Sequence, residues 1–178
     1  MPASVHLTGV KARSPALCII RNRSTSPGRR FRGLCIMHKI LVPIDSSDNA
    51  TRALQHAVRL AKEDGSVELH IVNAHKPPIV YGEVAVYMSQ EKAKQLQRQH
   101  SEIILKPAIE IAKAAGVKFT SEILIGDVPQ ALVKCAEDKG CDGVVMGTRG
   151  MGAIGNLVRG SVATKVIHLT KLPVTLVR

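Results

Sequence analysis

The sequence predicts an α/β fold with helices on both faces of a doubly wound, open parallel sheet. Five strands in the order 3-2-1-4-5 are expected, as in Rossmann-like and flavodoxin-like proteins. The chain has 178 residues, of which 45% are hydrophobic, enough for one domain with a substantial core. From Met37 onward, short apolar runs alternate with stretches of helical periodicity. Strands separated by helices are joined by right-handed crossovers, which gives a mostly parallel sheet.

The first half of the pattern contains two strands and two helices. Residues 39–45, KILVPID, form the first apolar run, and the SSDN that follows offers N-caps for a helix ending at Gly65. Residues 67–74, VELHIVNA, predict the second strand. After a loop over 75–87, a long helix is expected over about 89–115, kinked or divided at Pro107.

The second half contains three strands and two helices. Alternating apolar residues over 117–125 predict the third strand, and Gly126-Asp127 forms a turn and helix cap. The helix that follows carries Pro129 in its first turn. The apolar run GVVMG at 143–147 predicts the fourth strand, Ser161 begins the last helix, and LPVTLV at 172–177 is the fifth strand.

The glycine-rich segment 147–161, GTRGMGAIGNLVRGS, follows the fourth strand. In parallel sheets, ligands bind outside the carboxyl ends of the strands, which makes this segment and PIDSSDN the candidate loops. A dinucleotide fingerprint (Gly150, Gly152, Gly155) does not fit, because it belongs after the first strand and needs a later acidic residue, and none follows Asp142. A P-loop over Gly155 to Gly160 does not fit either, because Ser161 stands where lysine is required.

A third pattern fits the segment. Gly147, Gly150 and Gly160-Ser161 have the spacing G-x2-G-x9-G-[ST], which resembles the nucleotide-binding branch of the universal stress protein family. The resemblance covers most of residues 38–178, including KILVPID, ELHIV, IGDVPQAL, DGVVMGTRG, GSVATKVI and LPVTLVR. It implies ATP or AMP as the ligand, with Mg²⁺ bound through the nucleotide.

The resemblance also implies where the nucleotide contacts lie. The implied set is Pro43, Ile44, Asp45, Ile71, Met146, Gly147, Gly150, Gly160, Ser161 and Val162. The first three would line the base and ribose, with Asp45 accepting from ribose hydroxyls or binding Mg²⁺. Ile71 would meet adenine through its main chain, and Met146 would pack on the base. Helix capping by Asp45, and plain core packing of Ile71 and Met146, remain open alternatives.

The chemistry of the last helix start agrees with a phosphate site. Its bare N–H groups and dipole attract anions, and the Ser161 hydroxyl adds a donor. Residues 143–178 contain no acidic residue and five basic ones, namely Arg149, Arg159, Lys165, Lys171 and Arg178. The alternative is a connector whose glycines serve only to turn the chain.

We expect a regulatory stress-response protein that binds a nucleotide and hydrolyses it slowly or not at all. No catalytic residue is identified: the loop has no P-loop lysine, and SGGxDS, the signature of PP-loop enzymes, is absent from PIDSSDN. A receiver domain is disfavoured because Asp127 suits a helix cap.

The fifth strand, 172–178, is expected at the sheet edge, where proteins that it resembles form homodimers. A weak ATPase and a nucleotide-free interaction module are the alternatives.

Residues 1–36 differ from the domain at 37–178. They carry seven basic residues and no acidic one; the 25 basic residues of the chain less these seven leave 18 against 14 acidic, so most of the net charge of +11 lies here. A targeting peptide, a binding tail, or sequence upstream of a start at Met37 each fit, and we favour the last, with little fixed structure.

Nucleic-acid binding is disfavoured because aromatic residues are scarce. Apolar runs such as 16–20 are too short to span a membrane, and four cysteines without metal spacing indicate reduced thiols and a cytoplasmic location.

Overall fold

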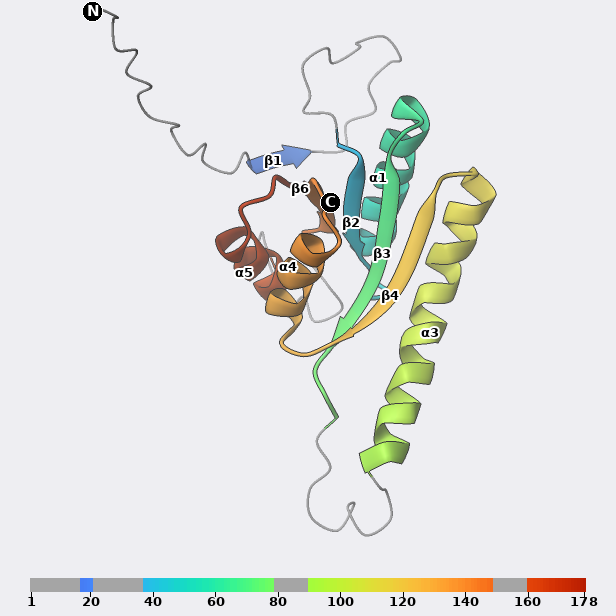
Figure 1. Cartoon of the computed structure of the whole chain (residues 1–178), viewed down its shortest axis with the longest axis vertical. Helices are drawn as coiled ribbons and strands as arrows, with labels where there is room; N and C mark the ends of the chain where they lie inside the picture. Colours follow the sequence, from blue (N-terminus) through green and yellow to red (C-terminus); the bar gives the residue numbers. More distant parts are fainter. Residues whose placement is uncertain (1–16, 21–36, 79–89, 149–159) are drawn as a thin grey trace, which may run out of the picture.

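The computed structural model describes residues 17–20 (backbone only), 37–78, 90–148 and 160–178 (Figure 1). They form one sheet of parallel strands with the order β1-β6-β5-β2-β3-β4. The strands are β1 (Leu17–Ile20), β2 (Lys39–Pro43), β3 (Glu68–His75), β4 (Phe119–Ile125), β5 (Gly143–Gly147) and β6 (Val174–Val177). Among the described residues, no helix is both long enough and apolar enough to cross a membrane.

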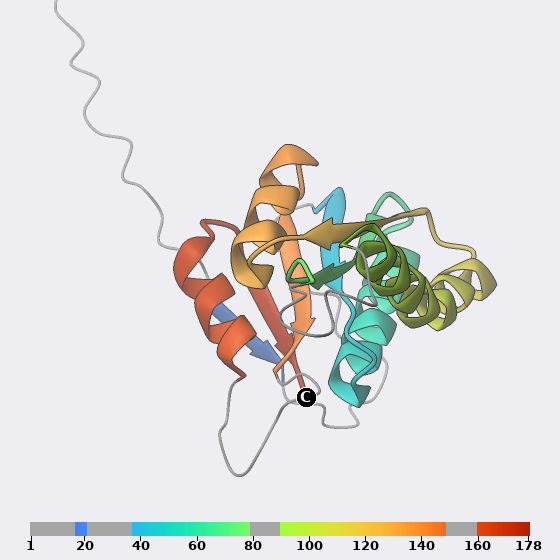
Figure 2. The ribbon, with the colours of Figure 1, turned by 90° about the horizontal axis from the view of Figure 1, so that it is seen from below.

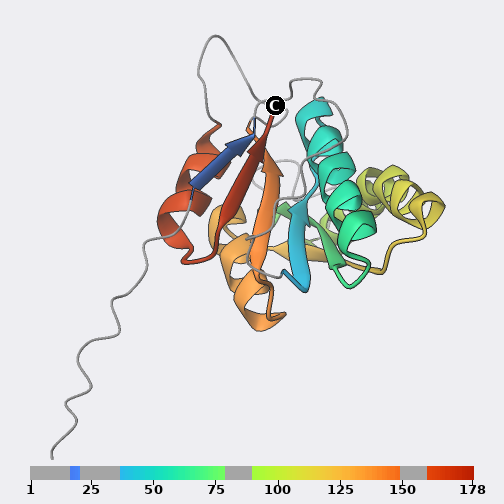
Figure 3. The same cartoon turned by 90° about the horizontal axis from the view of Figure 1, so that it is seen from above.

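The five strands of the predicted domain confirm the expected order. Taken from β2 to β6 along the chain, they are arranged 3-2-1-4-5, and the crossovers between them carry the helices. The sixth strand was not predicted. β1 comes from the basic segment expected to have little fixed structure, and it pairs with β6 from Leu17 beside Val174 to Ile20 beside Val177. β6 is therefore not the edge strand that the sequence predicts, because β1 covers its outer side (Figure 3).

In the described part of the chain, helices cover both faces of the sheet, two on each (Figure 2). α1 (Asp48–Asp64) and α3 (Gln90–Ala115) pack on one face, and α4 (Val128–Asp138) and α5 (Ser161–Leu169) on the other. The predicted helix ends are confirmed: Gly65 closes α1 with a left-handed φ of 72°, and Asp127 caps α4 by accepting from the Gln130 N–H. Of the two outcomes expected at Pro107, a division does not occur, because α3 is one helix through that residue, and a kink stays a prediction.

The core has two layers because successive strand residues point to opposite faces. Ile40, Val42, Leu69, Ile71 and Val145 pack against α1 and α3. Leu41, Val72, Val144, Met146 and Leu176 pack against α4 and α5. Full burial of one such side chain contributes about 1.5–3 kcal/mol. His70 and Asn73 are the exceptions in β3, because these polar side chains are only 3% and 5% exposed.

Candidate functional site

The carboxyl ends of β2 and β5 lie side by side, and the starts of α1 and α5 meet them there. We call this region the nucleotide edge, after the ligand that the sequence resemblance implies: Pro43–Asp45, the start of α1 from Ser47, Gly147–Thr148 and Gly160–Val162. β2 pairs with β5 in parallel, with Ile40 beside Gly143 and Leu41 beside Val144, so the carboxyl ends of both strands lie at the same side of the sheet. Parallel α/β sheets bind ligands in this position.

The end of β2 is fixed by backbone hydrogen bonds. The Ile44 N–H donates to the Val72 carbonyl at 2.8 Å, and the Asn73 side-chain amide donates to the Ile44 carbonyl at 2.7 Å. The Ile44 side chain is 6% exposed and belongs to the core on the α1 face. The Ile44 side chain therefore packs within the protein, and a contact from its backbone to a nucleotide stays a prediction.

Asp45 shapes the turn between β2 and α1. Its Oδ1 accepts from the Ser47 N–H at 3.2 Å and from the Ser47 hydroxyl at 2.6 Å. Between them, Ser46 has a left-handed φ of 59°. Ser47, and not Asp45, is the N-cap of α1, since its Oγ accepts from the Ala50 N–H at 3.2 Å. A carboxylate offers about four lone-pair positions, so these two bonds leave Asp45 able to accept more.

Glycine is required at position 147 because another part of the protein lies too close to leave room for a side chain. A Cβ added there would lie 2.8 Å from Asn49 Cβ, 2.9 Å from the Asn49 carbonyl carbon and 3.1 Å from the Ala50 nitrogen. Two of these atoms are backbone, so they cannot move without moving the start of α1. The sequence explained the missing side chain by close approach of a ligand. The structure supplies a different reason, which is the close packing of α1 on the end of β5.

The two residues that flank 149–159, Thr148 and Gly160, are joined by a hydrogen bond. Thr148 donates its N–H to the Val177 carbonyl at 2.9 Å, and its own carbonyl accepts from the Gly160 N–H at 2.7 Å. The second bond brings the end of β5 to the start of α5. Gly150 lies outside the described residues, so its expected phosphate contact stays a prediction.

The start of α5 has the properties expected of an anion site. Gly160 is the N-cap in extended conformation and makes no side-chain capping bond, which leaves the first helical N–H groups without that partner. The first turn holds no acidic residue, and Ser161 is exposed there. The helix dipole therefore acts without opposition from a carboxylate in that turn.

Thr148 lies at this edge and is not among the contacts that the sequence predicts. It is 3% exposed, and its Oγ1 makes no hydrogen bond within the described residues. A buried hydroxyl without a partner is costly, so the position favours a polar group next to it. The available signal was the GTRG sequence itself, where a small polar residue follows the strand directly.

The remaining predicted contacts lie in the core. Ile71 is fully buried on the α1 face in the middle of β3, and Met146 is 5% exposed on the α4 and α5 face. Val162 is partly buried and packs on the same core as Met146. The structure thus brings Pro43–Asp45, Gly147 and Gly160–Ser161 to one edge, while the side chains of Ile71 and Met146 pack within the protein. A contact from either to a base stays a prediction.

This architecture defines a class: open parallel α/β sheets with a ligand position at the strand ends. Comparison with known proteins defines the family. Residues 37–178 match the model of the Usp (universal stress protein) family. Universal stress protein MJ0531 of Methanocaldococcus jannaschii is 33% identical over 140 residues, which cover 79% of this chain and 81% of the relative. The chain belongs to the universal stress protein family.

Solved structures agree with this assignment. The structure of MJ0577 has a TM-score of 0.68 and 26% identity, and the match covers 79% of this chain and 94% of that one. A universal stress protein in complex with cAMP has a TM-score of 0.57 and 26% identity, with 80% and 97% covered. The fold of the predicted domain is thus shared with these proteins.

Proposed function

We propose that this protein binds ATP or AMP at the nucleotide edge and acts as a regulatory stress-response protein with slow or no hydrolysis. The bond between Thr148 and Gly160 is the observation that carries the proposal, because it joins the end of β5 to a helix start that attracts phosphate. A relative of the same fold that binds cAMP supports an adenine nucleotide as the ligand class. A turnover above about 1 s⁻¹, the low end for ordinary enzymes, would contradict the regulatory assignment.

Each part of the nucleotide has a proposed position. The phosphates lie against the N–H groups of Gly160–Val162 and the Ser161 and Thr148 hydroxyls. The ribose lies near Asp45 at the end of β2, with Gly147 between these two parts. Mg²⁺, where present, would be held by the phosphates and one carboxylate oxygen of Asp45, the arrangement that Mg²⁺ commonly adopts in proteins.

Calorimetric titration with ATP tests the phosphate position. Ser161→Asp places a negative charge at the first residue of α5, where it favours the helix but repels phosphate. We expect the affinity for ATP to fall by about tenfold or more, equivalent to about 1.4 kcal/mol, with the melting temperature unchanged or raised. Gln130→Glu, which adds the same charge to the first turn of α4, is the matched control.

Adenosine separates the phosphate contact from the rest of the site. Because adenosine has no phosphate, we expect its affinity to be the same in the native protein and in Ser161→Asp. Equal ATP affinities of the native protein and Ser161→Asp would reject the site. An equal loss for ATP and adenosine would place the base, and not the phosphates, at α5.

We also propose that the protein forms a homodimer through strand 172–178. In this structure β1 occupies the outer side of β6, so a dimer of that kind needs β1 to leave its position. Nucleotide binding at the ends of β2 and β5 would then act close to an edge that a second copy contacts.

A further inference from the structure

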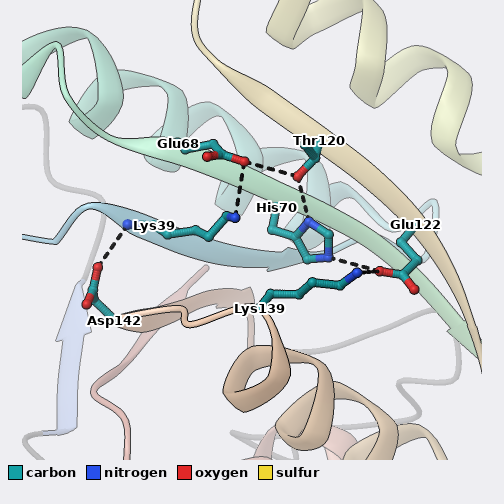
Figure 4. Close-up of polar contacts among 7 residues, drawn as sticks. All are labelled: Lys39, Glu68, His70, Thr120, Glu122, Lys139 and Asp142. Carbon is teal, nitrogen blue, oxygen red and sulfur yellow. Dashed lines mark hydrogen bonds and ion pairs between the residues drawn. The ribbon is translucent and has the colours of Figure 1, made fainter.

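A second cluster of polar side chains lies away from the nucleotide edge, on the face of the sheet that α4 covers. His70 in β3, Glu122 in β4 and Cys135 in α4 each offer one ligand atom, and these atoms all lie within 4.8 Å of one another. We call these three residues the metal triad. Figure 4 shows the imidazole of His70 between Thr120 on one side and Glu122 on the other.

The contacts of Thr120 with His70 and Glu68 favour Nδ1 as the ring nitrogen that carries the proton. Thr120 Oγ1 donates to the Glu68 carboxylate at 3.3 Å, and a carboxylate can only accept. The Thr120 hydroxyl has no second proton, so at 2.7 Å it accepts from His70 Nδ1–H. In neutral imidazole the lone pair is then on Nε2, which points toward Glu122.

Burial lowers the pKa of His70. Its side chain is 4% exposed, and desolvation is the main cause that lowers its pKa, against the opposing effect of Glu122. Nε2 makes no hydrogen bond within the described residues, and its contact with Glu122 Oε2 is 3.4 Å long. In the neutral form of His70, a buried nitrogen lone pair would face a carboxylate oxygen, and these two groups repel each other unless a proton or a cation lies between them.

The arrangement matches the way proteins hold metal ligands. A metal-binding histidine donates its other ring N–H to an oxygen that is itself held in place, as Thr120 and Glu68 do here, with Glu68 also 3.3 Å from Lys39 Nζ. Tetrahedral zinc with nitrogen, oxygen and sulfur ligands places those atoms about 3.3–3.8 Å apart. The pair of His70 and Glu122 already has this spacing, and the third atom needs a movement of about 1 Å.

We propose that His70 Nε2, Glu122 Oε2 and Cys135 Sγ bind Zn²⁺, with water as the fourth ligand. Imidazole, carboxylate and thiolate in a tetrahedral set favour Zn²⁺ over Mg²⁺ or Ca²⁺. Cys135 is 5% exposed and in no disulfide, and on binding its S–H bond breaks, the sulfur bonds to zinc, and the proton passes to solvent.

Lys139 competes with the metal. Its Nζ lies 2.9 Å from Glu122 Oε2, so it supplies the positive charge that the ion would replace. The Lys139 side chain is 43% exposed and can move into solvent. Removal of this charge therefore strengthens metal binding, an effect that a purely structural role of the triad does not predict.

Cobalt spectroscopy on the full chain tests the proposal. The Cys18→Ser/Cys35→Ser background leaves Cys135 and Cys141 as the remaining thiols of the four in the chain. With Co²⁺ we expect a thiolate-to-cobalt charge-transfer band that Zn²⁺ abolishes, at one ion per chain. Cys135→Ser should remove the band and weaken Zn²⁺ at least about tenfold, while Cys141→Ser, at the second buried thiol, should keep both.

Two lysine substitutions that each remove a positive charge test the effect of Lys139, for which we expect a zinc affinity that changes in the direction opposite to that of Cys135→Ser. Lys139→Met should raise Zn²⁺ affinity by about tenfold or more, and Lys134→Met, the same change at an exposed position of α4, should leave it unchanged. Zn²⁺ should raise the melting temperature of the background protein but not of its Cys135→Ser derivative. The proposal is overturned if the cobalt band is absent, if it persists in Cys135→Ser, or if Lys139→Met and Lys134→Met bind zinc equally. Circular dichroism confirms that each variant is folded.

Discussion

The nucleotide edge and the metal triad belong to one sheet but are built in opposite ways. The edge is made mainly of backbone: helix N–H groups at α5, the Ile44 carbonyl, and Gly147, which has no side chain. The triad is made of side chains from three elements that packing brings together. A backbone site depends on how closely elements approach, whereas a side-chain site depends on which polar atoms remain without partners.

The two constructions respond to different substitutions. The edge should be sensitive to the smallest added group, because its neighbours are main-chain atoms. The triad should tolerate changes of volume but respond to the loss of a single hydrogen-bonding or charged atom. Three substitutions test these expectations and the role of β1, taken in order of their expected effect on the free energy of unfolding.

Gly147→Ala should have the largest effect. The added methyl group meets the backbone of Asn49 and Ala50, so α1 must shift, at a cost of about 1–3 kcal/mol in the free energy of unfolding. Gly143→Ala is the control and should lose less, because its closest contact is the flexible end of Met37 at 3.1 Å, which can move aside, and the closest backbone atom of another segment, the Pro173 carbonyl oxygen, is 3.3 Å away. Urea unfolding of both variants measures the difference. Equal losses would show that the edge is not held by backbone contact.

Thr120→Val should have an intermediate effect. The change keeps the shape but leaves His70 Nδ1–H without its acceptor, for an expected loss of about 1 kcal/mol, since water at this exposed position replaces part of the bond. Thr120→Ser keeps the hydroxyl and should recover most of the loss. If valine and serine behave alike, Thr120 does not hold the His70 proton.

Cys18→Pro/Ile19→Pro should have the smallest effect on stability. Adjacent backbone N–H groups of a strand point in opposite directions, so two prolines remove a donor to β6 whichever one faces it. A four-residue edge strand contributes little, and we expect less than about 0.5 kcal/mol. Sedimentation should instead show more dimer, because the β6 edge is released. An unchanged monomer–dimer equilibrium would place the dimer interface elsewhere.

The sequence predicts the helix ends well because their signals are local. Gly65, Asp127 and Gly160-Ser161 act within one turn of the chain, so each helix end could be assigned from neighbouring residues alone. The strand order followed from the alternation of strands and helices together with the family resemblance. The reason for Gly147 could not be predicted, because it depends on Asn49, a residue nearly one hundred positions away.

The metal triad and β1 were missed for related reasons. His70 and Glu122 are 52 positions apart and meet only because β3 and β4 pair, and Cys135 joins them from a helix on the sheet face. The apolar run at 16–20 was long enough for a strand, but it lies among basic residues with no periodicity, and only its pairing with β6 gives it a partner.

Mass spectrometry of nucleotide released from the purified protein tests the central claim most directly. We expect the native protein, once denatured, to release an adenine nucleotide in a fixed ratio to the chain, Gln130→Glu to release the same amount, and Ser161→Asp to release little. Equal release by the native protein and Ser161→Asp would contradict the claim that phosphates lie at the start of α5. So would a native protein that releases none and shows no affinity for added ATP or AMP.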